Sequence, residues 1–296
     1  MSDKKDISVE ESKQTSVQPL VSVVVVTYNS SGTVLETLDS IKRQTYSNIE
    51  LIISDDCSSD DTVNVCRAWL NKNTSRFANS EIVSTIQNTG VSGNLNRGVK
   101  QSHGEWIKSI AGDDMLVPSA IEEYINFIYE NTDKVRMCVC DVEPFTENGV
   151  KPTRVIERYK RYFELEGENY EQQRKRVLTS LVFIGPAFFY SRELYDEVGG
   201  FTEKYGCAEE WPFVYKVIRG GNRIYAFNKK LVRYRVQAQS LCHTEDNLGS
   251  KRVFDGMYRH FFDYAFKDLI LEGQIITALR QAKSYLRRRW LFFKNK

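Results

Sequence analysis

Residues 20–29 read LVSVVVVTYN, and this stretch decides the fold that we expect. The run is apolar up to Val26, apart from Ser22, and it ends in the polar triplet Thr27, Tyr28 and Asn29. A continuous apolar run of this length, without alternation, is typical of a strand buried on both faces of a parallel sheet. We therefore predict a buried strand over residues 20–27.

Strand and helix patterns alternate after this first strand. Strands are predicted over residues 50–54, 82–87 and 106–110, and helices over residues 34–43, 62–70 and 92–101. This alternation predicts an α/β domain with a mostly parallel central sheet and helices on both faces. Ser119 and Glu122 have capping-box spacing, which predicts another helix after Pro118. In open sheets of this kind, ligands bind at the carboxyl ends of the strands.

Length and composition are those of a globular protein. Of the 296 residues, 41% are hydrophobic and 27% are charged, and no run approaches the roughly 18 apolar residues of a membrane span. Residues 1–18 are polar, which predicts a disordered leader; they lack the pattern of a secretory signal, so we expect a cytoplasmic location. The six cysteines form no CxxC pair, and Cys138 and Cys140 share a strand face, which indicates structural thiols.

Positive charge is concentrated at the C-terminal end. Residues 280–296 contain seven Lys or Arg and no acid, so the rest of the chain carries −5 of the formal total of +2. A nucleic-acid-binding protein would spread positive charge over a folded face, so no nucleic-acid partner is expected.

The segment from Phe254 onward is predicted to be helical. Its apolar residues recur at three- and four-residue steps: Leu279, Ala282, Leu286, Trp290 and Phe293. One interpretation, the commoner outcome for such a helix, is that this stripe packs back on the core. The other is that the stripe, with the basic residues 287–289, anchors the protein at an anionic membrane surface.

Two acidic clusters follow predicted strands. Asp55 and Asp56 come after the strand over residues 50–54, and Asp113 and Asp114 follow the strand over residues 106–110. Carboxylates crowded at one sheet edge repel each other unless a cation or hydrogen-bond donors compensate them. We therefore expect a divalent cation, Mn²⁺ or Mg²⁺, at one cluster, because both ions prefer oxygen ligands.

Each cluster alone is also compatible with a solvated turn or a helix cap. For Asp60 and Asp61 we favour the cap, since the helix predicted over residues 62–70 begins directly after them.

The ordered series of motifs resembles the family 2 glycosyltransferases. The resemblance covers about residues 20–240 and rests on VSVVVVTYN at 21–29, SI at 40–41, QTY at 44–46, DD at 55–56, NTGVS at 88–92, GE at 104–105 and GDD at 112–114. It implies the Rossmann-like GT-A fold over residues 19–245. A nucleotide-sugar-binding half would span residues 19–117 and an acceptor-binding half residues 118–245, followed by a basic helical extension over 246–296.

The resemblance also implies the activity and its partners. The protein would move a sugar, with inversion, from a UDP-sugar or another nucleotide-diphospho-sugar to a hydroxyl of an acceptor glycan. The setting would be surface polysaccharide or capsule synthesis, with an acceptor that can be lipid-linked and an enzyme at the inner face of the membrane.

Single residues take their expected roles from the same resemblance. The residues that would border the nucleotide are Thr27, Tyr28 and Asn29. Asp56, with Asp55, would accept a hydrogen bond from the base. Asp114 would bind the metal directly, and Asp113 would hold the ribose or assist. Ala111 stands where many members have a first aspartate, so fewer acids remain for the metal.

The second half of the chain continues the resemblance. The matching motifs are GPA at 185–187, VGGF at 198–201, EEW at 209–211 and YR at 234–235. Glu210 stands at the position of the catalytic base, usually an aspartate in the family, and Glu209 would support it. Arg235 would pair with phosphate oxygens in bidentate fashion. Gln237 replaces a histidine that often adds a metal ligand, and His243 is out of register. Without the resemblance, both glutamates would be interpreted as first-turn helix acids.

Two other functions stay open at this point. A sugar-phosphate nucleotidyltransferase would need a Gly-rich basic loop after the first strand, whereas residues 27–32 contain no Lys or Arg. The second is a non-catalytic protein that binds a nucleotide or a glycan on a degenerate transferase fold; Ala111 and Glu210 keep this alternative open. A haloacid-type phosphatase is disfavoured, because the cluster at Asp55 lacks the Asp-x-Asp-x-Thr order.

Overall fold

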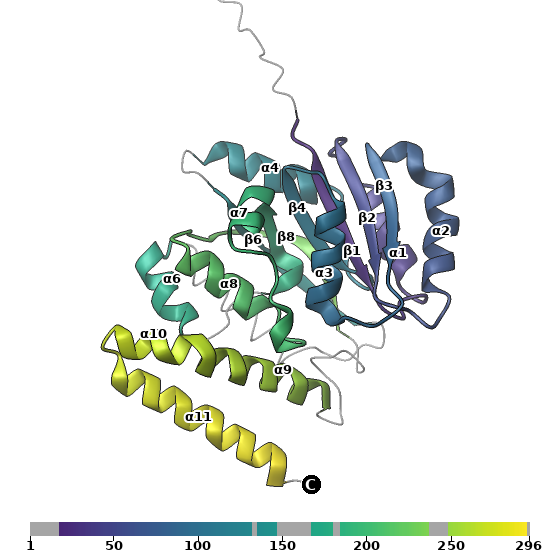
Figure 1. The fold of residues 1–296 in the computed structure, drawn as a ribbon. Coiled ribbons are helices and arrows are strands. Elements are labelled where there is room, and N and C mark those ends of the chain that lie inside the picture. The colour runs from purple at the N-terminus through teal and green to yellow at the C-terminus, as the bar shows by residue number, and fades with distance from the viewer. Residues whose placement is uncertain (1–17, 132–134, 147–166, 180–183, 237–247, 295–296) are drawn as a thin grey trace, which may run out of the picture.

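The computed structural model describes residues 18–131, 135–146, 167–179, 184–236 and 248–294 (Figure 1). The predicted leader up to residue 17 and the two residues Gln237 and His243 lie outside these ranges.

An eight-stranded sheet forms the centre of the described part of the chain. Its strands are β1 (Val21–Thr27), β2 (Ile49–Asp55), β3 (Asn79–Ser84), β4 (Trp106–Ala111), β5 (Met115–Leu116), β6 (Met137–Phe145), β7 (Phe188–Ser191) and β8 (Tyr225–Arg235), in the order β3-β2-β1-β4-β7-β6-β8-β5. Strands β1 to β4 are parallel, β7 is antiparallel to β4 and β6, and β5 is antiparallel to β8. The predicted mixed and mostly parallel sheet is confirmed.

Helices cover both faces of this sheet. They are α1 (Val34–Lys42), α2 (Thr62–Asn73), α3 (Gly90–Gln101), α4 (Ala120–Glu130), α6 (Tyr170–Val177), α7 (Arg192–Glu197) and α8 (Glu210–Arg219). The crossovers through α1 and α2 run in one direction along the sheet, and the crossover through α3 returns across it. Because such crossovers are right-handed, α3 packs on the opposite face, in front of β1 in Figure 1.

The strand order places a topological switch point between β1 and β4. From β1 the chain proceeds outward to β2 and β3, and then returns to pair β4 with the other side of β1. Val26 therefore lies beside Ala111, and Thr27 beside Asp55. In open α/β sheets, ligands bind in the crevice at such a point. The loops after β1, β2 and β4 thus meet where a site is expected.

The predicted helix caps form only in part. Ser119 precedes α4, but its side chain makes no capping bond; Glu122 instead accepts a hydrogen bond of 2.6 Å from Thr45 Oγ1. Asp61 likewise precedes α2 without capping it, whereas Asp60 accepts from the backbone N–H of Thr62 at 3.0 Å. Glu122 is thus engaged with Thr45, and Asp60 rather than Asp61 serves the first turn of α2.

The C-terminal segment forms a helical hairpin. Its first arm comprises α9 (Leu248–His260), a π-helical turn (Phe261–Ala265) and α10 (Phe266–Leu271), and its second arm is α11 (Ile275–Lys294), which lies beyond α9 and α10 at the bottom of Figure 1. The predicted helical extension is confirmed. Among the described residues, no helix is both long enough and apolar enough to cross a membrane.

Candidate active site

The ends of β1 and β2 are tied together by side chains. Thr27 Oγ1 donates to Asp55 Oδ1 at 2.9 Å, and the backbone N–H of Ser58 donates to Asp55 Oδ2 at 2.9 Å. Both Thr27 and Asp55 are buried. Their side chains therefore shape the loops of the predicted nucleotide site rather than line its surface.

The residues after Thr27 turn outward. Asn29 has a φ of +50°, and its amide oxygen accepts from the backbone N–H of Ser59 at 2.8 Å. Its own N–H donates to Ser58 Oγ at 2.8 Å. Asn tolerates this left-handed backbone region better than most residues. The turn leaves the Tyr28 ring exposed beside the switch point, where it can meet a planar ligand.

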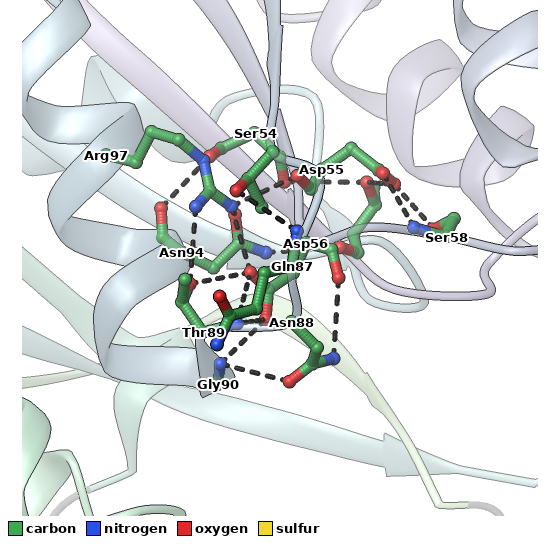
Figure 2. A network of polar contacts seen from close by, with 12 residues as sticks. Ser54, Asp55, Asp56, Ser58, Gln87, Asn88, Thr89, Gly90, Asn94 and Arg97 are labelled. Carbon is green, nitrogen blue, oxygen red and sulfur yellow. Dashed lines mark hydrogen bonds and ion pairs between the residues drawn. The ribbon is translucent and has the colours of Figure 1, made fainter.

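Asp56 is the centre of a dense polar network (Figure 2). Its carboxylate accepts from Thr89 Oγ1 at 2.6 Å, from the N–H of Gly90 at 2.8 Å, from the N–H of Thr89 at 3.0 Å, and from Arg97 Nη2 at 3.1 Å. Burial raises the pKa of Asp56, but these hydrogen bonds outweigh it and hold the pKa below its ordinary value. A nucleobase N–H would have to displace one of these donors.

Asp114 follows β4 and is buried at the switch point. Its Oδ1 accepts from the backbone N–H of Arg235 at 2.9 Å, which fixes the end of β8 against the loop. Its Oδ2 is buried and has no hydrogen-bond partner in the part of the chain that the structure describes. Burying a carboxylate oxygen without a hydrogen-bond partner destabilises the folded state unless a ligand binds that oxygen.

The electrostatics of this pair favour a cation. Burial raises the pKa of Asp114 well above its ordinary value, and the neighbouring charge of Asp113 raises it further. Burial raises the pKa of Asp113 as well, although Arg235 opposes the shift. A divalent cation would stabilise both ionised forms, so these two oxygen donors fit one. Within the described residues, no group of three His, Cys, Asp or Glu side chains is arranged as a metal site.

The Arg235 side chain makes several contacts within the protein. Its Nε donates to the carbonyl of Asp113 at 2.8 Å, and its Nη2 is 3.1 Å from Glu36 Oε1. The guanidinium also lies over the Phe145 ring, 4.7 Å from the centroid. These contacts bury the guanidinium and hold the Asp113–Asp114 loop, and the bidentate contact of Arg235 with phosphate stays a prediction.

Glu209 and Glu210 lie at the start of α8. The N–H of Gly185 donates to Glu210 Oε1 at 2.5 Å, which fixes the direction of that carboxylate. Glu209 Oε2 is buried without a hydrogen-bond partner among the described residues. Burial, with the charge of Glu210, raises the pKa of Glu209 to about 8. Burial and the neighbouring carboxylate therefore favour the protonated form of Glu209.

Lys108 is a site residue that sequence reasoning missed. It is fully buried on β4, and its ammonium donates to the carbonyls of Pro186 at 2.5 Å and Phe188 at 3.3 Å. Tyr124 adds a bond of 3.0 Å to the carbonyl of Ala187. Burial lowers the pKa of Lys108 to about 8. The available signal was a single charged residue, Lys108, within a central strand that is otherwise apolar except for Ser109.

These contacts connect the two acidic pairs. Lys108 lies close enough to Asp114 for their charges to influence each other. The same ammonium binds the carbonyl of Pro186, and the preceding N–H, of Gly185, holds Glu210. Asp114 and Glu210 are thus linked through one buried lysine and one short turn. The arrangement suits a reaction in which one carboxylate accepts a proton while the other group handles an anionic leaving group.

A sequence model described as "Glycosyl transferase family 2" matches residues 22–199, more than half of the chain. The chain belongs to glycosyl transferase family 2. The predicted family and the predicted glycosyltransferase activity are therefore confirmed.

Curated relatives agree with this membership. An uncharacterized glycosyltransferase of Rickettsia typhi is 25% identical over 240 residues, which cover 79% of this chain and 70% of that protein. The protein WfaP of Escherichia coli is 36% identical over 118 residues, 39% of this chain and 43% of that protein. WfaP is named a UDP-Glc:alpha-D-GlcNAc-diphosphoundecaprenol beta-1,3-glucosyltransferase.

Solved structures show the same fold. The mannosyltransferase PcManGT from Pyrobaculum calidifontis, in complex with GDP-Man and Mn²⁺, has a TM-score of 0.62 at 19% identity and covers 92% of this chain and 75% of its own. TarS of S. aureus, residues 1–349 in complex with UDP-GlcNAc, has a TM-score of 0.59 at 18% identity, covering 90% and 79%. The predicted GT-A type of architecture is thereby confirmed.

Replacing Lys108 with Met tests its role in positioning Glu210. The variant keeps the length of the side chain but leaves the carbonyls of Pro186 and Phe188 without their donor. We expect a loss in the free energy of unfolding of about 1–3 kcal/mol per orphaned carbonyl, together with a lower kcat at little-changed KM. Urea unfolding and steady-state kinetics on the folded variant measure the two effects.

Lys216→Met is the matched control. Lys216 on α8 also donates to backbone carbonyls, those of Gly199 and Gly200, but it does not contact the Gly185 turn. This variant should lose stability and keep its kcat. Equal losses of kcat in both variants would show that general loosening of the fold, rather than the Gly185 turn, limits the reaction.

Proposed function

We propose that this family 2 chain is an inverting transferase that moves a sugar from a UDP-sugar to a hydroxyl of an acceptor glycan. The observation that carries the proposal is the link from the buried, incompletely satisfied Asp114 through Lys108 to the oriented Glu210. Inversion requires a single in-line displacement, with a base on the acceptor side and charge compensation on the diphosphate side.

In this proposal Glu210 is the catalytic base. The N–H of Gly185 directs its carboxylate, and the raised pKa of Glu209 favours a neutral neighbour for it. Glu210 takes the proton of the acceptor hydroxyl as that oxygen attacks the anomeric carbon and the bond to the diphosphate breaks. The oxygen attacks from the face opposite the leaving group, so the configuration inverts and no covalent intermediate with the protein forms.

The nucleotide would bind at the ends of β1 and β2. We assign Tyr28 and Asn29, both exposed there, to its border, with Thr27 and Asp55 supporting them from below. Asp56 would accept from the base edge only after a donor such as Thr89 moves away. Asp114, with Asp113, would hold Mn²⁺ or Mg²⁺, which when bound supplies positive charge to the departing diphosphate.

The donor and acceptor classes draw support from named similar proteins. TarS has been solved with UDP-GlcNAc, and WfaP is named for a UDP-glucose donor and a diphosphoundecaprenol-linked acceptor. We therefore propose a lipid-linked glycan acceptor and a role in surface polysaccharide synthesis, with the enzyme on the cytoplasmic side of the membrane.

Donor screening tests this function directly. The purified chain is incubated with UDP- and GDP-sugars in the presence of Mn²⁺, Mg²⁺ or EDTA, and nucleotide diphosphate release is measured with and without lipid-linked glycans. We expect release from a UDP-sugar that requires the metal and increases with acceptor. Release from GDP-sugars alone would overturn the choice of uridine, and metal-independent release would overturn the role of the Asp113–Asp114 pair.

A further inference from the structure

Helix α11 is fixed to the rest of the protein by one narrow face. Ala278, Ala282 and Tyr285 are buried on this face. The Tyr285 ring packs on Phe261, with 4.8 Å between ring centroids, and lies 6.4 Å from Trp211 at the start of α8. The two alanines allow the backbone of α11 to approach the first arm of the hairpin closely. These contacts fix the orientation of α11 about its own axis.

This orientation turns the apolar stripe outward. The exposed fractions are 76% for Ile276, 58% for Leu279, 52% for Leu286 and 56% for Trp290. At 100° per residue these four side chains fall within about 80° of the helix circumference. The sequence-based expectation that the stripe packs on the core is therefore wrong for Leu279, Leu286 and Trp290. Only Ala282 of the described stripe residues is buried.

Basic side chains border the outer edge of this stripe. Helix α11 contains six Lys or Arg residues and no Asp or Glu. By the same helical geometry, Arg287 and Arg280 lie about 20° and 40° beyond Ile276, on the side of the stripe away from the buried face, and Lys283 lies within the stripe between Trp290 and Ile276. The Lys294 ammonium lies over the Trp290 ring, 4.7 Å from its centroid. An apolar stripe with aromatic residues and a basic border is typical of a helix that lies in a membrane interface.

We propose that this exposed face of α11 binds the surface of an anionic lipid bilayer, with the helix axis parallel to the membrane. Charge decides between a bilayer and a second copy of the chain. Two copies of α11 paired across this face would bring their basic borders together without any acid on either helix, whereas anionic headgroups compensate the same charges.

The place of the hairpin gives this binding a consequence. A Cβ on Gly256 of α9 would meet the carbonyl oxygen of Tyr205 at 2.2 Å and the Cβ of Ala208 at 2.7 Å, so α9 packs directly on the segment that precedes Glu209. The hairpin therefore connects the lipid-binding face of α11 with the segment that precedes Glu209. Binding itself does not depend on catalysis, so its test is independent of the proposed function.

Vesicle sedimentation tests the proposal on the full chain. Phosphatidylcholine vesicles with and without phosphatidylglycerol are used at low and high salt. We expect the protein to pellet with the anionic vesicles and to be released by salt, because the attraction decays within a Debye length. Leu286→Ser combined with Trp290→Ser should weaken binding at least about tenfold through lost apolar burial. Because both side chains are exposed, thermal unfolding should be unchanged.

Two neighbouring arginines give a matched pair of charge variants. Arg287→Gln, at the edge of the stripe, should weaken binding about fivefold, the loss of one basic contact near the surface. Arg288 lies about 200° around the helix from Leu286, so Arg288→Gln should bind like the parent. The proposal is overturned if the parent chain does not pellet with anionic vesicles, or if both arginine variants weaken equally. It is also overturned if light scattering shows a dimer that the Leu286→Ser, Trp290→Ser variant abolishes.

Discussion

Replacing Glu210 with Gln should lower kcat for sugar transfer by about 10²- to 10⁴-fold, the usual contribution of a general base. The amide keeps the size of the side chain, and its oxygen can still accept from the N–H of Gly185, but it cannot take the proton of the acceptor hydroxyl. KM for the nucleotide sugar should change little, because Glu210 acts on the acceptor. Initial rates at saturating donor and acceptor measure the effect.

Glu209→Gln is the matched control, the same change one residue earlier. Because the pKa of Glu209 is raised to about 8, Gln resembles the state already present at neutral pH, and we expect only a small loss of kcat. If Glu209→Gln abolished transfer and Glu210→Gln did not, the assignment of the base would be wrong.

Glu209→Gln should also change how the stability of the protein depends on pH. The folded pKa of Glu209, about 8, lies above the ordinary value of 4.5, so the folded state binds a proton that the unfolded state releases. The parent chain should therefore lose stability as the pH rises from about 4.5 to about 8. Glu209→Gln should lack this slope and exceed the parent in melting temperature at the upper end. Thermal unfolding across this pH range checks the sign.

Much of the fold could be predicted because its signals are local. The apolar runs of β1, β2 and β4 are continuous in sequence, and the intervening helices have their own periodicity. Strand β8, which runs from Tyr225 to Arg235, is harder to predict. Its residues Asn228, Lys229 and Lys230 are exposed, opposite an irregularity in register at Asp141 of β6. A bulge of this kind interrupts the alternation on which strand prediction depends.

The site was predictable as a set of acids but not as a set of contacts. Asp114 and Arg235 are 121 residues apart, and only the folded chain shows that the backbone of Arg235, rather than its guanidinium, meets the carboxylate. The saturation of Asp56 by donors from the start of α3 likewise arises from tertiary packing. Sequence motifs identify which residues gather at the sheet edge, whereas hydrogen-bond partners decide which of their atoms stay available.

Asp114→Asn should reduce metal-dependent turnover of the nucleotide sugar by about 10²-fold or more, because a bound cation supplies several kcal/mol of charge stabilisation to a leaving diphosphate. The substitution changes only the oxygen of Asp114 that is available to a cation, Oδ2. The amide oxygen can still accept from the N–H of Arg235, so the end of β8 keeps its anchor, while the buried Oδ2 becomes an NH₂ group that cannot bind a cation.

A readout without turnover distinguishes a lost cation from a damaged fold. Burial raises the pKa of Asp114 well above its ordinary value, so its neutral form is favoured in the folded state, and a neutral isostere should not lower the melting temperature in EDTA. The parent chain should gain stability when Mn²⁺ and UDP are added together, since ligands that bind only the folded state raise it. Asp114→Asn should lose most of that gain.

Asp60→Asn is the control for this experiment. Asp60 lies at the same sheet edge, but its carboxylate accepts from the backbone amides of Thr62 and Ser31. Its substitution should leave the gain from Mn²⁺ and UDP intact.

If the Asp114→Asn chain kept both turnover and this gain in stability, the assignment of a cation to Asp114 would be wrong. A parent chain that bound Mn²⁺ and UDP, and released no diphosphate from any sugar donor, would instead be a binding protein on a transferase fold. Asp114 would then hold a ligand that Glu210 never acts upon.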